Sequence, residues 1–193
     1  FEHKLKLGDE FLIQIEFLQH LFKSLFKIDA PIRFERIEKG ENLFYLNPTN
    51  KVIYRFLTNI FDLPSGSKTT CIKVPILIKK SSKEIKKWFV RRVFDSDGDT
   101  RATEKGFNSR PRIKLRMKSA FFVCEMKKMI EENFNVSVNG PYKDKNNSSS
   151  YIQIERRADI LKLSEDFLFL HPIKKWRLNK TKKNLIKKIK CGL

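Results

Sequence analysis

The chain has 193 residues and a large excess of positive charge: 41 Lys and Arg against 22 Asp and Glu, a formal net charge of +19. Its 40% apolar residues are too many for a disordered polybasic tail, and no apolar stretch reaches the ~18 residues that a membrane span needs. Three cysteines without a CxxC pair and three scattered histidines argue against a disulfide framework or a zinc site, and they fit a reducing compartment. The composition predicts a soluble, folded protein with a polyanionic partner.

The first part of the chain carries little of this charge. Residues 1–80 hold 13 basic and 9 acidic side chains, so their net charge is only +4. Hydrophobic patterning predicts strands at 1–7, 32–37 and 43–46, and helices at 11–26 and 51–61. Asp9 is the expected N-cap of the first helix. The Pro- and Ser-containing segment 63–82 is the expected connection to the second part.

The second part of the chain is the strongly basic one, with a net charge of +15 over residues 81–193. Its pattern predicts helices at 83–96, 120–133 and 158–168, strands at 99–103, 110–118, 136–138 and 151–155, and a basic amphipathic helix at about 180–190. Ser119 is the expected cap of the second helix, and 139–150 is the expected loop between the last two strands. A polyanion is therefore expected to contact mainly this half.

The two parts repeat each other at an offset of 108 residues. Leu43-Phe44-Tyr45-Leu46 matches Tyr151-Ile152-Gln153-Ile154, and Ile60 to Pro64 matches Leu168 to Pro172. The repeat predicts two domains, 1–75 and 76–193, in which the first lacks its initial helix and strand. On this interpretation Phe1 is a truncated or processed start.

One predicted strand presents a basic face. Side chains at alternate positions of a strand share a face, and five cations alternate along 110–118. They are Arg110, Arg112, Lys114, Arg116 and Lys118. Arg101, Tyr151 and Gln153 are expected to extend this face, and Lys4 and Lys6 give a weaker echo in the first repeat. Such a ribbon fits the major groove of DNA, whereas the alternative is an ordinary solvated sheet face.

A compact acidic cluster interrupts the basic half at Asp95-Ser96-Asp97-Gly98-Asp99. Carboxylates at the end of a helix can be simple capping and turn residues. Alternatively, they hold a hard divalent cation, which metal-assisted hydrolysis of a phosphodiester requires. The residues alone leave both interpretations open.

The helix that ends in this cluster resembles a known signature. Its residues are Phe89, Val90, Arg91, Arg92, Val93, Phe94, Asp95, Ser96, Asp97 and Gly98. This run resembles the motif of the LAGLIDADG homing endonucleases. The stretches around Leu63 to Lys68 and Phe169 to Lys175 look like the family's linker and its "HP.K" block.

The resemblance implies a fold, an activity and a set of site residues. The fold is α+β, with tandem pseudo-twofold αββαββα repeats that form saddle-shaped antiparallel sheets, here with the first repeat truncated. The activity is site-specific hydrolysis of double-stranded DNA with Mg²⁺ or Mn²⁺, in proteins associated with intron or intein mobility. Asp97 is implied as the metal ligand, Lys174 and Lys68 as catalytic residues and Lys175 as a DNA contact, while Asp95 shapes the helix end.

Two departures from the pattern keep an alternative open. Arg92 stands where a small residue usually lets two motif helices touch, and the first repeat has no motif. The alternative is a catalytically degenerate DNA- or RNA-binding protein, such as a transcriptional regulator or an intron maturase, with structured RNA as a partner. The chain is expected to act as a two-repeat monomer, or paired with a second chain, in the nucleoid region of the cytoplasm and not at a membrane. A weaker alternative is a ribosome- or membrane-surface protein that binds through its basic tail, 174–190.

Overall fold

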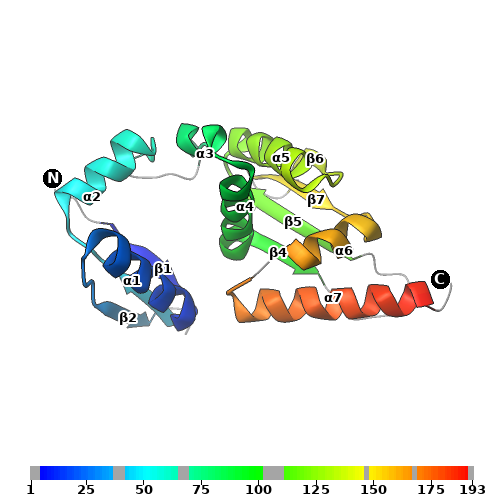
Figure 1. Ribbon diagram of the computed structural model, residues 1–193, viewed down its shortest axis with the longest axis horizontal. Helices are drawn as coiled ribbons and strands as arrows, with labels where there is room; N and C mark the ends of the chain where they lie inside the picture. Colours follow the sequence, from blue (N-terminus) through cyan, green and yellow to red (C-terminus); the bar gives the residue numbers. More distant parts are fainter. Residues whose placement is uncertain are drawn as a thin grey trace. The chain divides into compact units, whose positions relative to one another are not determined.

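The computed structural model describes residues 5–36, 42–64, 70–101, 111–145, 148–166 and 169–190. The chain forms two compact units, Phe1–Asp62 and Leu63–Leu193, each with an antiparallel sheet and helices (Figure 1). The predicted α+β class is therefore confirmed. No helix within the described residues combines the length and the apolar character that crossing a membrane requires.

The first unit is built on a three-stranded sheet of order β1-β3-β2. Its elements are β1 (Leu7–Asp9), α1 (Leu12–Phe26), β2 (Ile32–Arg36), β3 (Asn42–Leu46), α2 (Lys51–Arg55) and the π-helical turn η1 (Phe56–Ile60). Helix α1 contacts the sheet through Ile15, which is fully buried with Leu46 and Ala30. Few side chains share this core, whereas Leu25 and Val52 of the same unit lie exposed.

The second unit is larger and carries a four-stranded sheet of order β4-β5-β7-β6. Its elements are α3 (Ile76–Lys80), α4 (Lys83–Asp97), β4 (Gly98–Arg101), β5 (Arg112–Met117), α5 (Ala120–Phe134), β6 (Asn139–Lys143), β7 (Ser150–Ile154), α6 (Arg157–Asp166) and α7 (Pro172–Lys190). As predicted, the hydroxyl oxygen of Ser119 accepts a hydrogen bond from the backbone N–H of Phe122 at 3.2 Å and caps α5.

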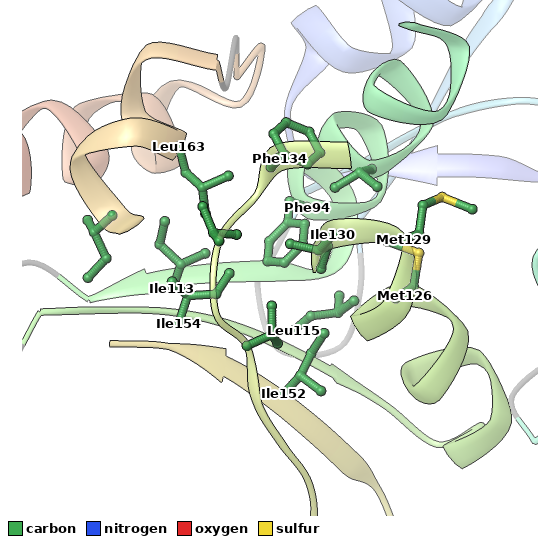
Figure 2. Packing of buried hydrophobic residues seen from close by; sticks show 14 of the residues in the cluster. Phe94, Ile113, Leu115, Met126, Met129, Ile130, Phe134, Ile152, Ile154 and Leu163 are labelled. Carbon is green, nitrogen blue, oxygen red and sulfur yellow. The ribbon is translucent and has the colours of Figure 1, made fainter. Parts of the chain in front are cut away.

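The hydrophobic core of the second unit lies on one face of its sheet. Ile113 and Leu115 of β5 and Ile152 and Ile154 of β7 are at most 1% exposed. Figure 2 shows these side chains gathered with Phe94, Met126 and Ile130 from the helices that cover this face. The other face of the sheet is thus left to the alternate, polar residues of the same strands.

The two sheets share a strand order. The sequence β1-β3-β2 has the connectivity of β5-β7-β6, and α1 follows β1 as α5 follows β5. In the described residues of the first unit, neither α4 nor β4 has a counterpart. This order is the one expected of a repeated unit, and the exact domain bounds 1–75 and 76–193 stay a prediction.

Three predicted elements have different bounds in the structure. Strand β6 is Asn139–Lys143 and not 136–138, because Val136 and Val138 are buried in the core and the ladder to β7 forms beyond them. Helix α7 begins at Pro172 and not at about 180, since proline fits the first turn of a helix. Of the strand predicted at 1–7, residues 1–4 lie outside the described residues, and β1 is Leu7–Asp9.

The first testable prediction concerns this core. Replacing Leu115, which is fully buried, by Ala should lower the free energy of unfolding of the second unit by about 2–5 kcal/mol, because the truncation leaves a cavity. The measurement is urea unfolding followed by circular dichroism. Leu77→Ala is the matched control, since Leu77 is 44% exposed and should cost less than about 1 kcal/mol. Equal losses in the two variants would contradict this packing.

Candidate nucleic-acid interface and active site

The polar face of the second sheet carries the predicted basic row. Arg112, Lys114 and Arg116 alternate along β5 with buried Ile113 and Leu115, as the pattern indicated. Residues paired directly across an antiparallel ladder lie on the same face of the sheet.

The strand register extends this face across the sheet. Arg112 pairs with Arg101, Lys114 pairs with both Asp99 and Gln153, and Arg116 pairs with Tyr151. Tyr151 in turn pairs with Tyr142 of β6. We call the residues Asp99, Arg101, Arg112, Lys114, Arg116, Tyr142, Tyr151 and Gln153 the strand face.

The positive charges of the strand face lie close together and are only partly compensated. The Lys114 ammonium lies 3.6 Å from the centre of the Tyr151 ring, and Arg116 forms an ion pair with Asp144 at 3.1 Å. Burial, followed by the guanidinium groups of Arg116 and Arg112, lowers the pKa of Lys114 from its usual 10.5, despite Asp144 and Asp99 nearby. A polyanion above this row would offset the part of this effect that comes from the two guanidinium groups.

The other predicted contacts are distributed less evenly. Arg110, Lys4 and Lys68 lie outside the described residues. Lys118 is exposed directly after β5, and Lys175 is exposed on α7. Lys6 belongs to the first unit, where it forms an ion pair with Glu35 at 2.9 Å and lies 4.4 Å from the centre of the Tyr45 ring.

Helix α4 ends in the acidic cluster, and Asp95 is the buried member. The Asp95 side chain is 4% exposed and accepts hydrogen bonds from the backbone N–H groups of His171 at 2.9 Å and Leu170 at 3.4 Å. Arg92 forms an ion pair with the same carboxylate at 3.0 Å. The oxygens of Asp95 are therefore used to attach α4 to the segment before α7.

Arg92 forms its ion pair with a residue of its own helix, Asp95. Its guanidinium contacts the Trp88 ring, 5.6 Å from the ring centre, as well as the carboxylate of Asp95. A bulky charged residue at this position is thus neutralised by a buried neighbour three residues further on. The sequence showed the conflict at Arg92 but not this solution.

The end of α4 carries exposed Asp97 and binds Lys174 of α7 through its backbone. Asp97 is exposed, and its carboxylate accepts a hydrogen bond from the Ser96 hydroxyl at 2.8 Å. The Lys174 ammonium donates to the carbonyl oxygens of Asp95 and Ser96, each at 2.6 Å. This cation satisfies carbonyl groups that the end of a helix leaves without partners, and it lies at the negative end of the helix dipole.

Gly98 joins α4 directly to β4. A Cβ atom at this position would lie 2.5 Å from the Phe94 carbonyl oxygen and 2.6 Å from Cδ1 of the Phe94 ring. No side chain fits there without moving the backbone, because the nearest atoms belong to the helix itself. This close approach explains in physical terms why glycine follows Asp97.

The acidic end of α4 offers few oxygen donors to a divalent cation. Within the described residues, no three or more His, Cys, Asp or Glu side chains gather into a cluster. Asp97 offers an exposed carboxylate, whereas Asp95 is buried and Asp99 is paired with Arg177 at 3.2 Å. Mg²⁺ commonly uses one or two carboxylates together with water and substrate phosphate, so Asp97 fits one half of such a site.

Two members of the site were missed by the sequence prediction. Arg177 contacts Asp99, which lies 78 residues earlier in the chain. The sequence prediction placed the start of this helix at about 180, so Arg177 was not assigned to it. Tyr142 was assigned to a loop, although it lies on β6 beside Tyr151, with 5.4 Å between ring centres. Only the strand register could have revealed the second of these contacts.

Comparison with known proteins identifies the fold. No protein-family model matches the chain, and no curated protein matches its sequence. Among solved structures, the chain is similar to mesophilic variants of the homing endonuclease I-DmoI, with 15% sequence identity, a TM-score of 0.59 and coverage of 86% of this chain and 74% of that chain. It is also similar to I-DmoI bound to its target DNA in the presence of Mg, with 14% identity, a TM-score of 0.58 and coverage of 85% and 79%.

A third similar structure is full-length DUF199/WhiA from Thermatoga maritima, with 13% identity and a TM-score of 0.57. The match covers 96% of this chain and 52% of that one. The N-terminal LAGLIDADG domain of DUF199/WhiA also matches, with a TM-score of 0.53. The chain therefore has the LAGLIDADG fold, which confirms the predicted resemblance at the level of the fold.

The second testable prediction compares the two carboxylates of the motif. Asp95→Asn should lower the free energy of unfolding by about 2–4 kcal/mol, because it removes the partner of Arg92 and places an N–H donor against backbone N–H groups. Asp97→Asn should change it by less than about 0.5 kcal/mol, since Asp97 is exposed. Chemical denaturation of both variants measures this contrast, and the reverse order of effects would contradict the assignment.

Proposed function

We propose that this chain, which has the LAGLIDADG fold, is a site-specific DNA endonuclease that binds duplex DNA on the strand face and hydrolyses phosphodiesters with Mg²⁺ or Mn²⁺ at Asp97. Similar structures with this fold include a homing endonuclease in complex with its target DNA in the presence of Mg. The proposal for this chain rests on its own residues, in two steps that are separately testable: binding and cleavage.

The observation that carries the binding step is the cationic row on β5. Arg112, Lys114 and Arg116 alternate along one face, and the core lies on the opposite face. A two-stranded antiparallel ribbon has the width of the DNA major groove, where Arg and Lys can bind guanine and neutralise phosphates. Gln153 in the neighbouring strand β7 adds an amide that can both donate hydrogen bonds to base edges and accept them.

The cleavage step is assigned to the end of α4. Asp97 would hold the cation, and the hydrogen bond from Ser96 orients its carboxylate. When bound, Mg²⁺ supplies Lewis-acid stabilisation of the phosphate and lowers the pKa of a bound water. Lys174 holds the last carbonyl groups of α4 and so fixes the position from which Asp97 projects. The catalytic roles of Lys174 and Lys68 toward the phosphate remain part of the proposal.

A second candidate function is a catalytically degenerate DNA- or RNA-binding protein. The two other carboxylates of the acidic cluster are already paired, Asp95 with Arg92 and Asp99 with Arg177, and the fold also occurs in WhiA. A regulator or an intron maturase would use the strand face without cutting. Exposed Tyr142 beside Tyr151 would suit stacking on unpaired bases of structured RNA.

We propose that the chain acts either as a monomer of two repeats or paired with a second chain. Pairing would supply the second carboxylate of a two-carboxylate site. A location among nucleoid DNA in the cytoplasm belongs to the same proposal.

The third testable prediction concerns binding. A variant that combines Arg112→Gln, Lys114→Gln and Arg116→Gln should bind random-sequence duplex DNA more weakly. The magnitude of the slope of log affinity against log salt should fall by about 2–3, because each phosphate contact contributes about 0.9. Fluorescence anisotropy over a salt series measures both. The control removes the same charge on the helical side of the unit, with Lys80→Gln, Lys83→Gln and Lys128→Gln, three exposed residues, and should bind as wild type. An unchanged slope in the strand variant would contradict the strand face as the DNA site.

The fourth testable prediction concerns cleavage. On duplexes selected from a random pool for tight binding, the wild-type chain with Mn²⁺ or Mg²⁺ should nick DNA, and EDTA should stop the reaction. Asp97→Asn should reduce nicking at least 100-fold while binding is retained, because it removes the ligand and not the strand face. Retained nicking in Asp97→Asn would contradict the role of Asp97. Tight binding without nicking by the wild-type chain would favour the non-catalytic alternative.

A further inference from the structure

Helix α7 presents a stripe of cations that the strand face does not include. Trp176, Lys180, Lys183 and Lys187 follow one another at intervals of four, three and four residues, which places them on one side of the helix. The opposite side carries Leu178, Thr181 and Leu185, which are at most 3% exposed. The apolar side of α7 is thus already packed into the second unit, and the cationic side faces outward.

The two flanks of α7 fix it beside the strand face. Arg177 forms an ion pair with Asp99, the residue of β4 that pairs with Lys114. On the other flank Lys182 pairs with Glu165 of α6 at 3.6 Å. Figure 1 shows α7 running alongside β4 within this unit. The helix therefore lies at the β4 edge of the sheet, where the strand face ends.

We propose that the outward stripe of α7 is a second contact with duplex DNA, which binds the phosphate backbone next to the segment held by the strand face. This inference rests on the proposed DNA binding by the strand face and extends its footprint past the edge strand. Arg177 contributes by neutralising Asp99, the acidic residue of β4 that would otherwise face the DNA at this edge.

The chemistry of the stripe favours phosphate. The Lys180 ammonium lies 4.8 Å from the centre of the Trp176 ring, and Lys183 and Lys187 are exposed at successive turns. Cations spaced in this way along a helix can neutralise successive phosphates, and each neutralised phosphate releases counterions. A helix that binds a membrane surface needs a separate apolar side for lipid, whereas Leu178 and Leu185 are buried and the exposed Ile173, Trp176 and Ile186 lie among the cations.

The test removes three charges from α7. The α7 variant combines Lys180→Gln, Lys183→Gln and Lys187→Gln. For a 30-base-pair random duplex, it should lower the magnitude of the slope of log affinity against log salt by about 2–3, because each contact contributes about 0.9. A short duplex that only covers the strand face should show a smaller change. The variant with Lys80, Lys83 and Lys128 replaced by Gln carries the same charge change and should keep the wild-type slope. Thermal unfolding confirms that each variant is folded.

The outcomes separate this inference from the proposed function. If the α7 variant keeps the wild-type slope while the strand variant loses it, the α7 contact is wrong and the strand face stands. If the wild-type chain does not bind duplex DNA, the proposed function itself fails. The α7 variant could instead lose binding to anionic phospholipid vesicles or to an RNA hairpin while its binding to duplex DNA is unchanged. That result would also overturn the α7 contact with DNA.

A spectroscopic measurement reports on α7 directly. The chain has two tryptophans, so Trp88→Phe leaves the indole of Trp176 as the only one. Adding duplex DNA should quench or shift the emission of Trp176, with a midpoint that follows the anisotropy titration. An emission spectrum that stays constant through saturation would contradict a contact at α7.

Discussion

The arrangement of the second unit depends on the buried carboxylate of Asp95. It binds the backbone N–H groups that precede α7, and Lys174 from the first turns of α7 binds the last carbonyl groups of α4 in return. Each helix thus supplies the polar partners that the other needs at the same point. A buried charge is tolerated only with such partners, so this exchange fixes α7 to the end of α4 and brings Arg177 to the edge strand.

The strand face shows how a concentrated positive charge is accommodated in a folded unit. Tyr151 beneath Lys114, Asp144 beside Arg116 and Asp99 at the edge each offset part of the repulsion. These partners belong to neighbouring strands or loops, and they leave the row with a net positive charge. A bound polyanion would offset the part of this repulsion that Arg112 and Arg116 exert on Lys114, whose pKa is lowered first by burial and then by these two groups.

The sequence predicted those features that depend on local pattern. The alternation on β5, the cap at Ser119 and the motif helix follow from spacing and side-chain type, and the structure confirms them. The contact of Arg177 with Asp99 joins residues far apart in the chain, so spacing gave no sign of it. The predicted position of β6 was wrong because Val136 and Val138, which are buried beside the sheet, carry the same pattern as residues within it. The predicted start of α7 was wrong because Pro172 lies in the first turn of the helix and does not end it.

The close packing of Gly98 on Phe94 has a mechanical consequence. Phe94 belongs to the hydrophobic core, yet its carbonyl group and ring set the direction in which the chain leaves α4. The exposed carboxylate of Asp97 is therefore connected to the interior through a single, tightly packed turn of helix. We expect a change in core volume around Phe94 to displace this carboxylate.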